Sequence, residues 1–266
     1  MSAFVRLLFL TYEIKPRTFQ VKFKHSQHSR KRLRIRSRAF GTVAAPWRGP
    51  EMLLFAREKI VLLSVPKTGT SAWAAALGAQ ASLVLRAPPA LKHMPLRRFR
   101  RRLLPLLEAS GVTGLEIVAV MRAPEDWLGS WYRYRRRPAL NGQPASTGSV
   151  SFDAFVRAYL AEDRPAYADL GSQARFLDPG DSGPPVDHLF RYENPGALVA
   201  FLESRLGRRI DLPRRNRSPA MPLALSPATR TRLRAERAAD FALYESIAAA
   251  GSAWPPRSAR AERNWR

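Results

Sequence analysis

The chain has 266 residues, of which 45% are hydrophobic, and a formal net charge of +24. This length and apolar content suit one large folded domain and exclude a chain that is disordered throughout. The chain has no cysteine, which excludes disulfides, zinc sites built on thiolates and cysteine nucleophiles, and favours a cytoplasmic location. No run approaches the roughly 18 apolar residues that a membrane-spanning helix requires.

The first fifty residues differ from the rest in charge. They hold 12 Lys and Arg and a single acid, Glu13. The segment KFKHSQHSRKRLRIRSR shows no periodic spacing of apolar residues. It is followed by GTVAAPWRGP, a segment rich in proline and glycine. We therefore expect residues 1–51 to be a basic extension, and residues 52–266 to form the domain. The extension is interpreted as a disordered arm, an organelle-targeting segment or the product of a wrongly assigned start codon.

From residue 59 onward, strand-like and helix-like segments alternate. Buried-type apolar runs predict strands over 59–65, 82–86, 116–121 and 186–192. Amphipathic or capped segments predict helices over 71–79, 95–109, 124–136, 151–160, 195–206 and 226–249, with Pro105 expected to bend or end the second helix. This order predicts an α/β fold of three layers, with a central, mainly parallel sheet flanked by helices. In such folds ligands bind beyond the carboxyl ends of the strands.

The stretch SVPKTGTSA follows the first of these strands and has the composition of an anion-binding loop. Backbone N–H groups at a helix start bind anions, and Gly69 allows a tight turn. Thr68, Thr70 and Ser71 add hydroxyl groups, and Lys67 adds a positive charge. The loop lacks the first glycine of the Walker A pattern, and its lysine precedes the glycine, which argues against a nucleoside triphosphate. An ordinary strand-to-helix turn is the alternative.

A second strand-to-helix junction, VMRAPEDWLGSWYRY, carries Arg122, Pro124 and Ser130. An arginine at a strand end and a hydroxyl on the next helix suit a phosphate. Together the two junctions resemble the cofactor site of sulfotransferases that use 3'-phosphoadenosine 5'-phosphosulfate (PAPS). The resemblance implies a P-loop-like phosphosulfate loop and a 3'-phosphate site that contains Arg122 and Ser130. The phosphosulfate loop would comprise Pro66, Lys67, Thr68, Gly69, Thr70 and Ser71.

The resemblance covers roughly residues 59–244. HLFRYENPGALVAFLESRLG is similar to the late strand and helix of that family, and Asn216 and Ser218 resemble its N-x-S segment. The R-K-G segment of the cytosolic animal enzymes is absent, so the chain is closer to the bacterial or Golgi-type branch.

The resemblance also implies a chemistry: transfer of a sulfuryl group to an acceptor, expected to be a hydroxyl, without a metal ion. Lys67 would stabilise the leaving oxygen, in the manner of phosphoryl transfer. A base near neutral pKa is needed to take the acceptor proton. His93, in LKHMPL, stands where the family often places its base, whereas His188 lies inside an apolar strand and is expected to pack there or accept a hydrogen bond.

Further side chains have only weak indications of function. The aromatic residues of the helix that carries Ser130 are expected to lie mostly in the core, although one of them would suit stacking on adenine. Gln173 is a candidate for the acceptor pocket, and Lys92 for binding an acidic acceptor. The arginines of the RRFRRR run over 97–102 are typical of a solvated face, or of a rim that receives an anionic acceptor.

Two other functions remain open at this stage. A P-loop kinase acting on a small metabolite would need Mg²⁺ and a nucleoside triphosphate. A basic nucleic-acid-binding protein would hold backbone phosphate in the same loop, with an affinity that falls steeply with salt. The sequence leaves the acceptor open among carbohydrates, lipids, phenols and proteins, and it does not indicate the oligomeric state.

Overall fold

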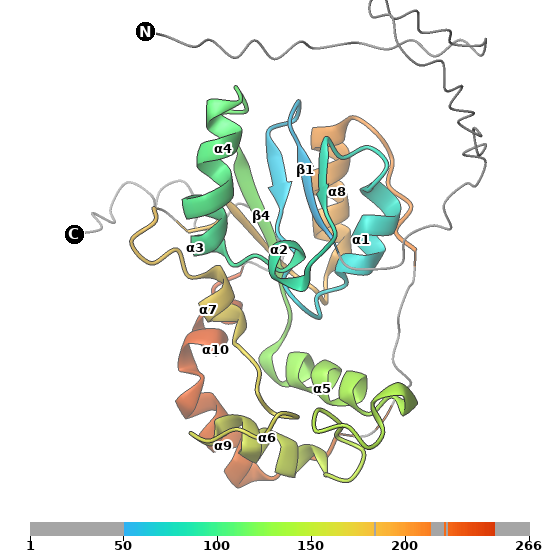
Figure 1. Ribbon diagram of the computed structural model, residues 1–266, viewed down its shortest axis with the longest axis vertical. Helices are drawn as coiled ribbons and strands as arrows, with labels where there is room; N and C mark the ends of the chain where they lie inside the picture. The colour runs from blue at the N-terminus through green and yellow to red at the C-terminus, as the bar shows by residue number, and fades with distance from the viewer. Residues whose placement is uncertain (1–50, 184, 214–220, 222, 248–266) are drawn as a thin grey trace, which may run out of the picture. The chain divides into compact units, whose positions relative to one another are not determined.

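The computed structural model describes residues 51–183, 185–213, 221 and 223–247. Its centre is a five-stranded sheet in the order β3-β1-β2-β4-β5 (Figure 1). The strands are β1 (Met52–Phe55), β2 (Ile60–Leu62), β3 (Leu83–Leu85), β4 (Glu116–Met121) and β5 (His188–Arg191). β2, β4 and β5 run parallel, while β1 pairs antiparallel with both β2 and β3. The predicted α/β class is confirmed, but the sheet is mixed rather than mainly parallel.

The strand β1 accounts for that difference. Its sequence, MLLF, is buried at every position and turns directly into β2, with Lys59 at a φ of 56°. A run of four apolar residues has no period that distinguishes a strand from other buried structure, so the sequence did not predict it. Glu51, just before β1, is buried and its carboxylate lies 3.0 Å from Arg86 Nε. The domain therefore includes Glu51, while the rest of the expected basic extension lies outside the described residues.

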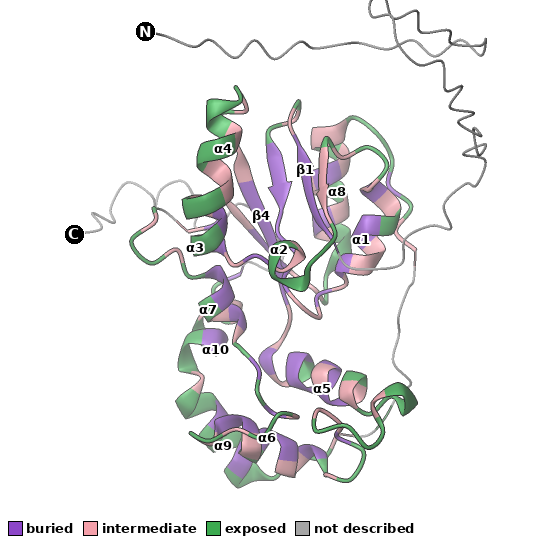
Figure 2. Cartoon of the chain, in the orientation of Figure 1, coloured by how far each residue is buried: buried purple, intermediate pink, exposed green. Residues whose placement is uncertain are grey.

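Helices cover both faces of the sheet, because side chains of alternate strand residues point to opposite faces. On one face α3 (Leu96–Arg98), a π-helical segment (Phe99–Leu103), α4 (Leu104–Ala109) and α7 (Gln173–Leu177) supply core residues. On the other face α1 (Thr70–Leu77) and α8 (Pro195–Leu206) do so. Figure 2 shows buried residues in β1 and β4 and in α1 and α7, whereas α4 has none. The helix expected over 95–109 runs without a break over 96–109, so Pro105, the second residue of α4, does not end it; the helix is π-helical over Phe99–Leu103, just before Pro105.

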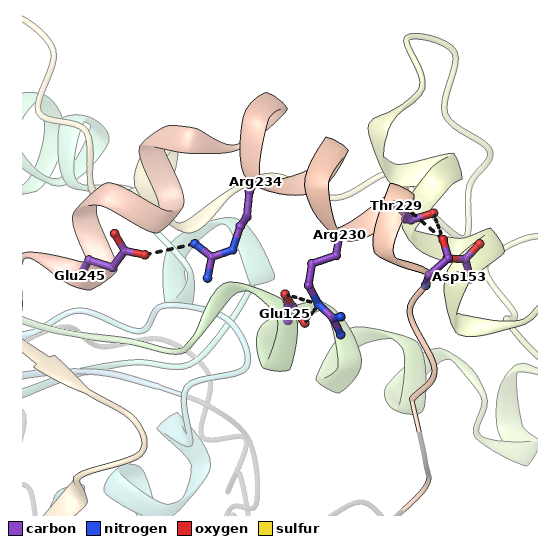
Figure 3. A network of polar contacts seen from close by, with 7 residues as sticks. Glu125, Asp153, Thr229, Arg230, Arg234 and Glu245 are labelled. Carbon is purple, nitrogen blue, oxygen red and sulfur yellow. Dashed lines mark hydrogen bonds and ion pairs between the residues drawn. The ribbon is translucent and has the colours of Figure 1, made fainter.

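A third apolar cluster is formed without strand residues, by helices and adjoining loops; the helices are α5 (Pro124–Arg135), α6 (Phe152–Leu160), α9 (Pro227–Glu236) and α10 (Ala238–Glu245). Ion pairs join α9 to α5 through Arg230 and Glu125, and to α10 through Arg234 and Glu245 (Figure 3). The remaining short helices are α2 (Pro89–Lys92) and a 3₁₀ turn (Pro138–Leu140).

The prediction of a single long helix over 226–249 is wrong, because the helix is interrupted at Arg237. This residue adopts φ −120° and ψ 30°, and its guanidinium donates to the carbonyl of Tyr159. Beyond the break, the buried Asp240 accepts a hydrogen bond from the backbone of Ala174 in α7. These contacts with distant segments redirect the helix, and local sequence preference does not reveal them.

His188 packs in the strand as expected, with its ring centre 4.5 Å from that of Phe201, but its Nε2 faces a carboxylate and so donates a hydrogen bond instead of accepting one. Its Nε2 lies 2.5 Å from Glu116 Oε2, and Arg205 donates to the same oxygen at 2.8 Å. The Arg205 guanidinium, with help from His188, lowers the pKa of Glu116 to about 2 despite its partial burial. Glu116 is the first residue of β4, so this cluster lies at the opposite end of the strand from the carboxyl edge, where ligands bind in α/β folds of this kind.

Candidate functional site

The loop over residues 64–71 leaves the carboxyl end of β2 and enters α1. Gly69 lies at φ 78°, and a Cβ added there would be 3.1 Å from the ring of Tyr192. Glycine is therefore favoured at this position for two reasons: the backbone has a positive φ, and a side chain would crowd the Tyr192 ring. The Thr68 hydroxyl donates to Val65 O at 2.8 Å, which closes the turn from inside. No side chain caps the start of α1, so its first N–H groups keep their capacity to bind an anion.

Lys67 occupies a left-handed conformation in this loop, with φ 67°. Its ammonium lies 4.2 Å from the ring centre of Tyr134 and 5.3 Å from that of Trp131. Burial, together with the positive charges of Arg137, Arg122 and Arg133, lowers the pKa of Lys67 to about 7. Since each of these charged neighbours is an arginine, the loop is the centre of a concentration of positive charge.

Helix α5 packs directly on the loop. Trp127 Nε1 donates to the carbonyl of Pro66 at 2.9 Å, and Trp131 and Tyr134 lie against Lys67. Ser130, 8% exposed, falls three residues after Trp127 and four before Tyr134. It therefore lies on the face of α5 that meets the loop. The structure thus brings together the two junctions that the sequence singled out. Of the three aromatic residues that make the contact, Trp127 is buried as expected, Trp131 is partly buried and Tyr134 is exposed.

Arg122 lies at the carboxyl end of β4, between the loop and β5. Its guanidinium stacks 4.4 Å from the ring centre of Tyr192, and its buried Nε has no hydrogen-bond partner among the described residues. Both backbone groups of Arg122 are bonded to Gln173, whose Oε1 accepts at 2.9 Å and whose Nε2 donates at 2.8 Å. Gln173 is 1% exposed, so it positions Arg122 rather than lining an open acceptor pocket.

His93 lies beside the start of the same loop. Its Nδ1 is 2.7 Å from the carbonyl oxygen of Ser64 and 3.3 Å from the Ser64 hydroxyl. A carbonyl only accepts, so Nδ1 carries the proton and Nε2 has a free lone pair in the neutral ring. Burial lowers the pKa of His93, with Lys92 and Lys67 adding to the effect against the opposing hydrogen bond to Ser64. The imidazole is therefore held neutral and in one tautomer.

A cavity of about 530 Å³ opens beside the loop, between α1 and α8. Its lining includes Gly69, Ala72, Trp73, Tyr192 and Glu193. The sequence reasoning missed the last two, although they follow β5 directly, at the edge of the sheet where ligands bind. Glu193 is held in place by a hydrogen bond from the backbone N–H of Ala123, at 2.9 Å, and by one from the hydroxyl of Tyr244, at 3.0 Å.

The other predicted residues lie in the first turns of α1 and α5 or outside the described residues. Asn216 and Ser218 lie outside the described residues. Thr70 is buried and Ser71 half-buried in the first turn of α1, while Pro124 begins α5. Within the ranges that the structure describes, no three His, Asp or Glu side chains are grouped so as to hold a metal ion, and no helix is long and apolar enough to cross a membrane.

Comparison with protein-family models, curated proteins and solved structures finds no match to this chain. The functional argument therefore rests on the residues of the site itself.

Proposed function

We propose that the protein is a PAPS-dependent sulfotransferase, an enzyme that moves a sulfuryl group from PAPS to an acceptor, expected to be a hydroxyl. The observation that carries the proposal is the convergence of Lys67, Arg122 and the start of α1 at one edge of the sheet, beside a cavity of nucleoside size. The positive charges around Lys67 that help to lower its pKa are unfavourable together without an anion, so their concentration here supports an anionic ligand.

The cofactor can be assigned to these groups by its chemistry. The N–H groups of residues 68–71 would bind the 5'-phosphosulfate, as a helix start does. Arg122 and Ser130 would bind the 3'-phosphate, and the unpartnered Arg122 Nε supplies one donor. The adenosine would enter the cavity lined by Ala72, Trp73 and Tyr192, whose aromatic rings suit a base.

The reaction is then an in-line displacement at sulfur. Bound PAPS would supply the sulfuryl group: the acceptor oxygen would bond to sulfur as the bond from sulfur to the bridging phosphate oxygen broke, and 3',5'-bisphosphoadenosine would leave with that electron pair. His93 Nε2 receives the acceptor proton, since Nδ1 is occupied by the Ser64 carbonyl. Lys67, protonated beside the anionic cofactor, stabilises the charge on the leaving oxygen. No step requires a metal ion, and the acceptor class stays open among carbohydrates, lipids, phenols and proteins.

The test is a calorimetric titration of the full chain with 3',5'-bisphosphoadenosine and, separately, with ATP and Mg²⁺. We expect micromolar binding of the bisphosphate without metal, weakened at least tenfold by Arg122→Ala. Arg157→Ala is the matched control, because it removes the same charge from α6, where Arg157 pairs with Asp153.

Two results would favour the other functions. Preference for Mg²⁺-ATP, with no effect of Arg122→Ala, would overturn the proposal in favour of a P-loop kinase. Binding of nucleic acid that is tighter than binding of either nucleotide and falls steeply with salt would favour a nucleic-acid-binding protein.

A further inference from the structure

A second cavity, of about 540 Å³, lies between α3, the π-helical segment and α7. Its lining shares no described residue with the cavity beside the loop. Five of its lining residues are arginines, namely Arg97, Arg98, Arg101, Arg102 and Arg175. The arginine run that was typical of a solvated face therefore forms one side of a hollow, with α7 on the other side.

The local structure explains why the arginines face this hollow. Leu96 and Phe99 are both fully buried and anchor α3 and the π-helical segment to the core under the sheet. Four arginines of this segment, Arg97, Arg98, Arg101 and Arg102, are all exposed. Because residues three or four positions apart lie on the same face of a helix, these arginines share the face opposite to Leu96 and Phe99. Arg175 joins them from α7, whose Phe176 and Leu177 are buried in the same core.

The arginine cavity has little compensating negative charge. Among the described residues, only Asp181 forms ion pairs with its arginines, at 3.2 Å from Arg97 and 2.5 Å from Arg101. The carboxylate of Asp178, also in the lining, accepts a hydrogen bond from the backbone of Gly180. The guanidinium groups of the other three arginines (Arg98, Arg102 and Arg175) have no hydrogen bond or ion pair with a described residue.

We propose that the arginine cavity binds a small multivalent anion that carries several closely spaced phosphate or sulfate groups. Guanidinium groups bind both of these through paired N–H donors, and several converging arginines match several anionic groups. The concave shape favours a small ligand over the convex backbone of a duplex. Asp181, 71% exposed, acts as an internal counter-ion that the ligand displaces from Arg97 and Arg101. This site does not depend on the proposed sulfuryl transfer.

The experiment titrates the full chain at constant ionic strength with tripolyphosphate and, separately, with sucrose octasulfate. The two probes distinguish a phosphate site from a sulfate site. We expect the double variant Arg98→Gln/Arg102→Gln to weaken binding of the preferred probe about 100-fold, from roughly tenfold for each lost charged hydrogen bond. Asp181→Asn should tighten binding several-fold, because it removes the competing carboxylate.

Control variants distinguish a specific binding site from nonspecific electrostatic attraction to a basic protein. Arg208→Gln removes the same charge just beyond α8, on the opposite face of the sheet, and should leave binding unchanged. If the double variant unfolds, Arg175→Gln tests the same cavity from a different helix.

The proposal is overturned if Arg208→Gln weakens binding as much as Arg175→Gln does. It is also overturned if neither probe binds more tightly than chloride, or if a twelve-nucleotide single strand binds more tightly than both probes through the same arginines. The last result would make the arginine cavity part of a nucleic-acid surface.

Discussion

The lowered pKa of Lys67 leads to a measurable coupling between ligand binding and protonation. Burial and the charges of Arg137, Arg122 and Arg133 lower this pKa to about 7 in the free protein. An anion bound at the loop favours the ammonium form and raises the pKa again. Binding of 3',5'-bisphosphoadenosine should therefore be accompanied by proton uptake, and the amount follows from the fraction of neutral lysine.

That fraction depends steeply on pH. With a pKa of about 7, Lys67 is half neutral at pH 7, about nine-tenths neutral at pH 8 and about one-tenth neutral at pH 6. The protein should take up about 0.9 proton for each bisphosphate bound at pH 8, and about 0.1 at pH 6, if the bound lysine is fully charged. Above pH 7 the affinity should fall by up to about tenfold for each pH unit, because neutral lysine must first be protonated.

Calorimetry in two buffers measures this uptake. Hepes and Tris differ in ionisation enthalpy, so the difference between the two observed binding enthalpies gives the number of protons exchanged. Lys67→Arg is the matched control: its guanidinium stays charged, so the uptake assigned to lysine should disappear. Equal enthalpies in the two buffers at pH 8 for the wild type would refute the reasoning, since Lys67 would then keep one protonation state throughout.

Three further predictions concern stability. Gly69→Ala should cost about 1–3 kcal/mol in urea unfolding, because it combines a positive φ with a contact of 3.1 Å to the Tyr192 ring; a loss near zero would contradict this strain. Gln173→Leu should cost about 1–3 kcal/mol and also weaken bisphosphate binding, because it leaves both backbone groups of Arg122 unpaired. The lowered pKa of Glu116 stabilises the folded state above pH 4.5, and this contribution disappears as the pH falls toward about 2. The difference in unfolding free energy between wild type and Glu116→Gln should therefore shrink across that range, and a constant difference would disprove the assignment.

Where strong local signals exist, the sequence predicted the elements well. The strand over Glu116–Met121 and the helix over Pro195–Leu206 have the predicted bounds. The first is a continuous apolar run of strand length, and the second begins with proline and is followed by Gly207 in a left-handed conformation. β1 and the break at Arg237 were not predictable in this way, because a short apolar run has no period and the break depends on contacts with Tyr159 and α7.

For the candidate site, the sequence alone placed Lys67 and Gly69 in a turn before a helix and Arg122 at a strand end, because strand, turn and helix preferences act over a few residues. Only the tertiary structure decided how these groups act together. It packed α5 against the carbonyl of Pro66, bonded His93 to Ser64, and placed Tyr192 between Gly69 and Arg122. These contacts join residues far apart in the chain. The charge of Lys67, the tautomer of His93 and the shape of the cavity beside the loop depend on that packing. Local sequence preference does not encode it.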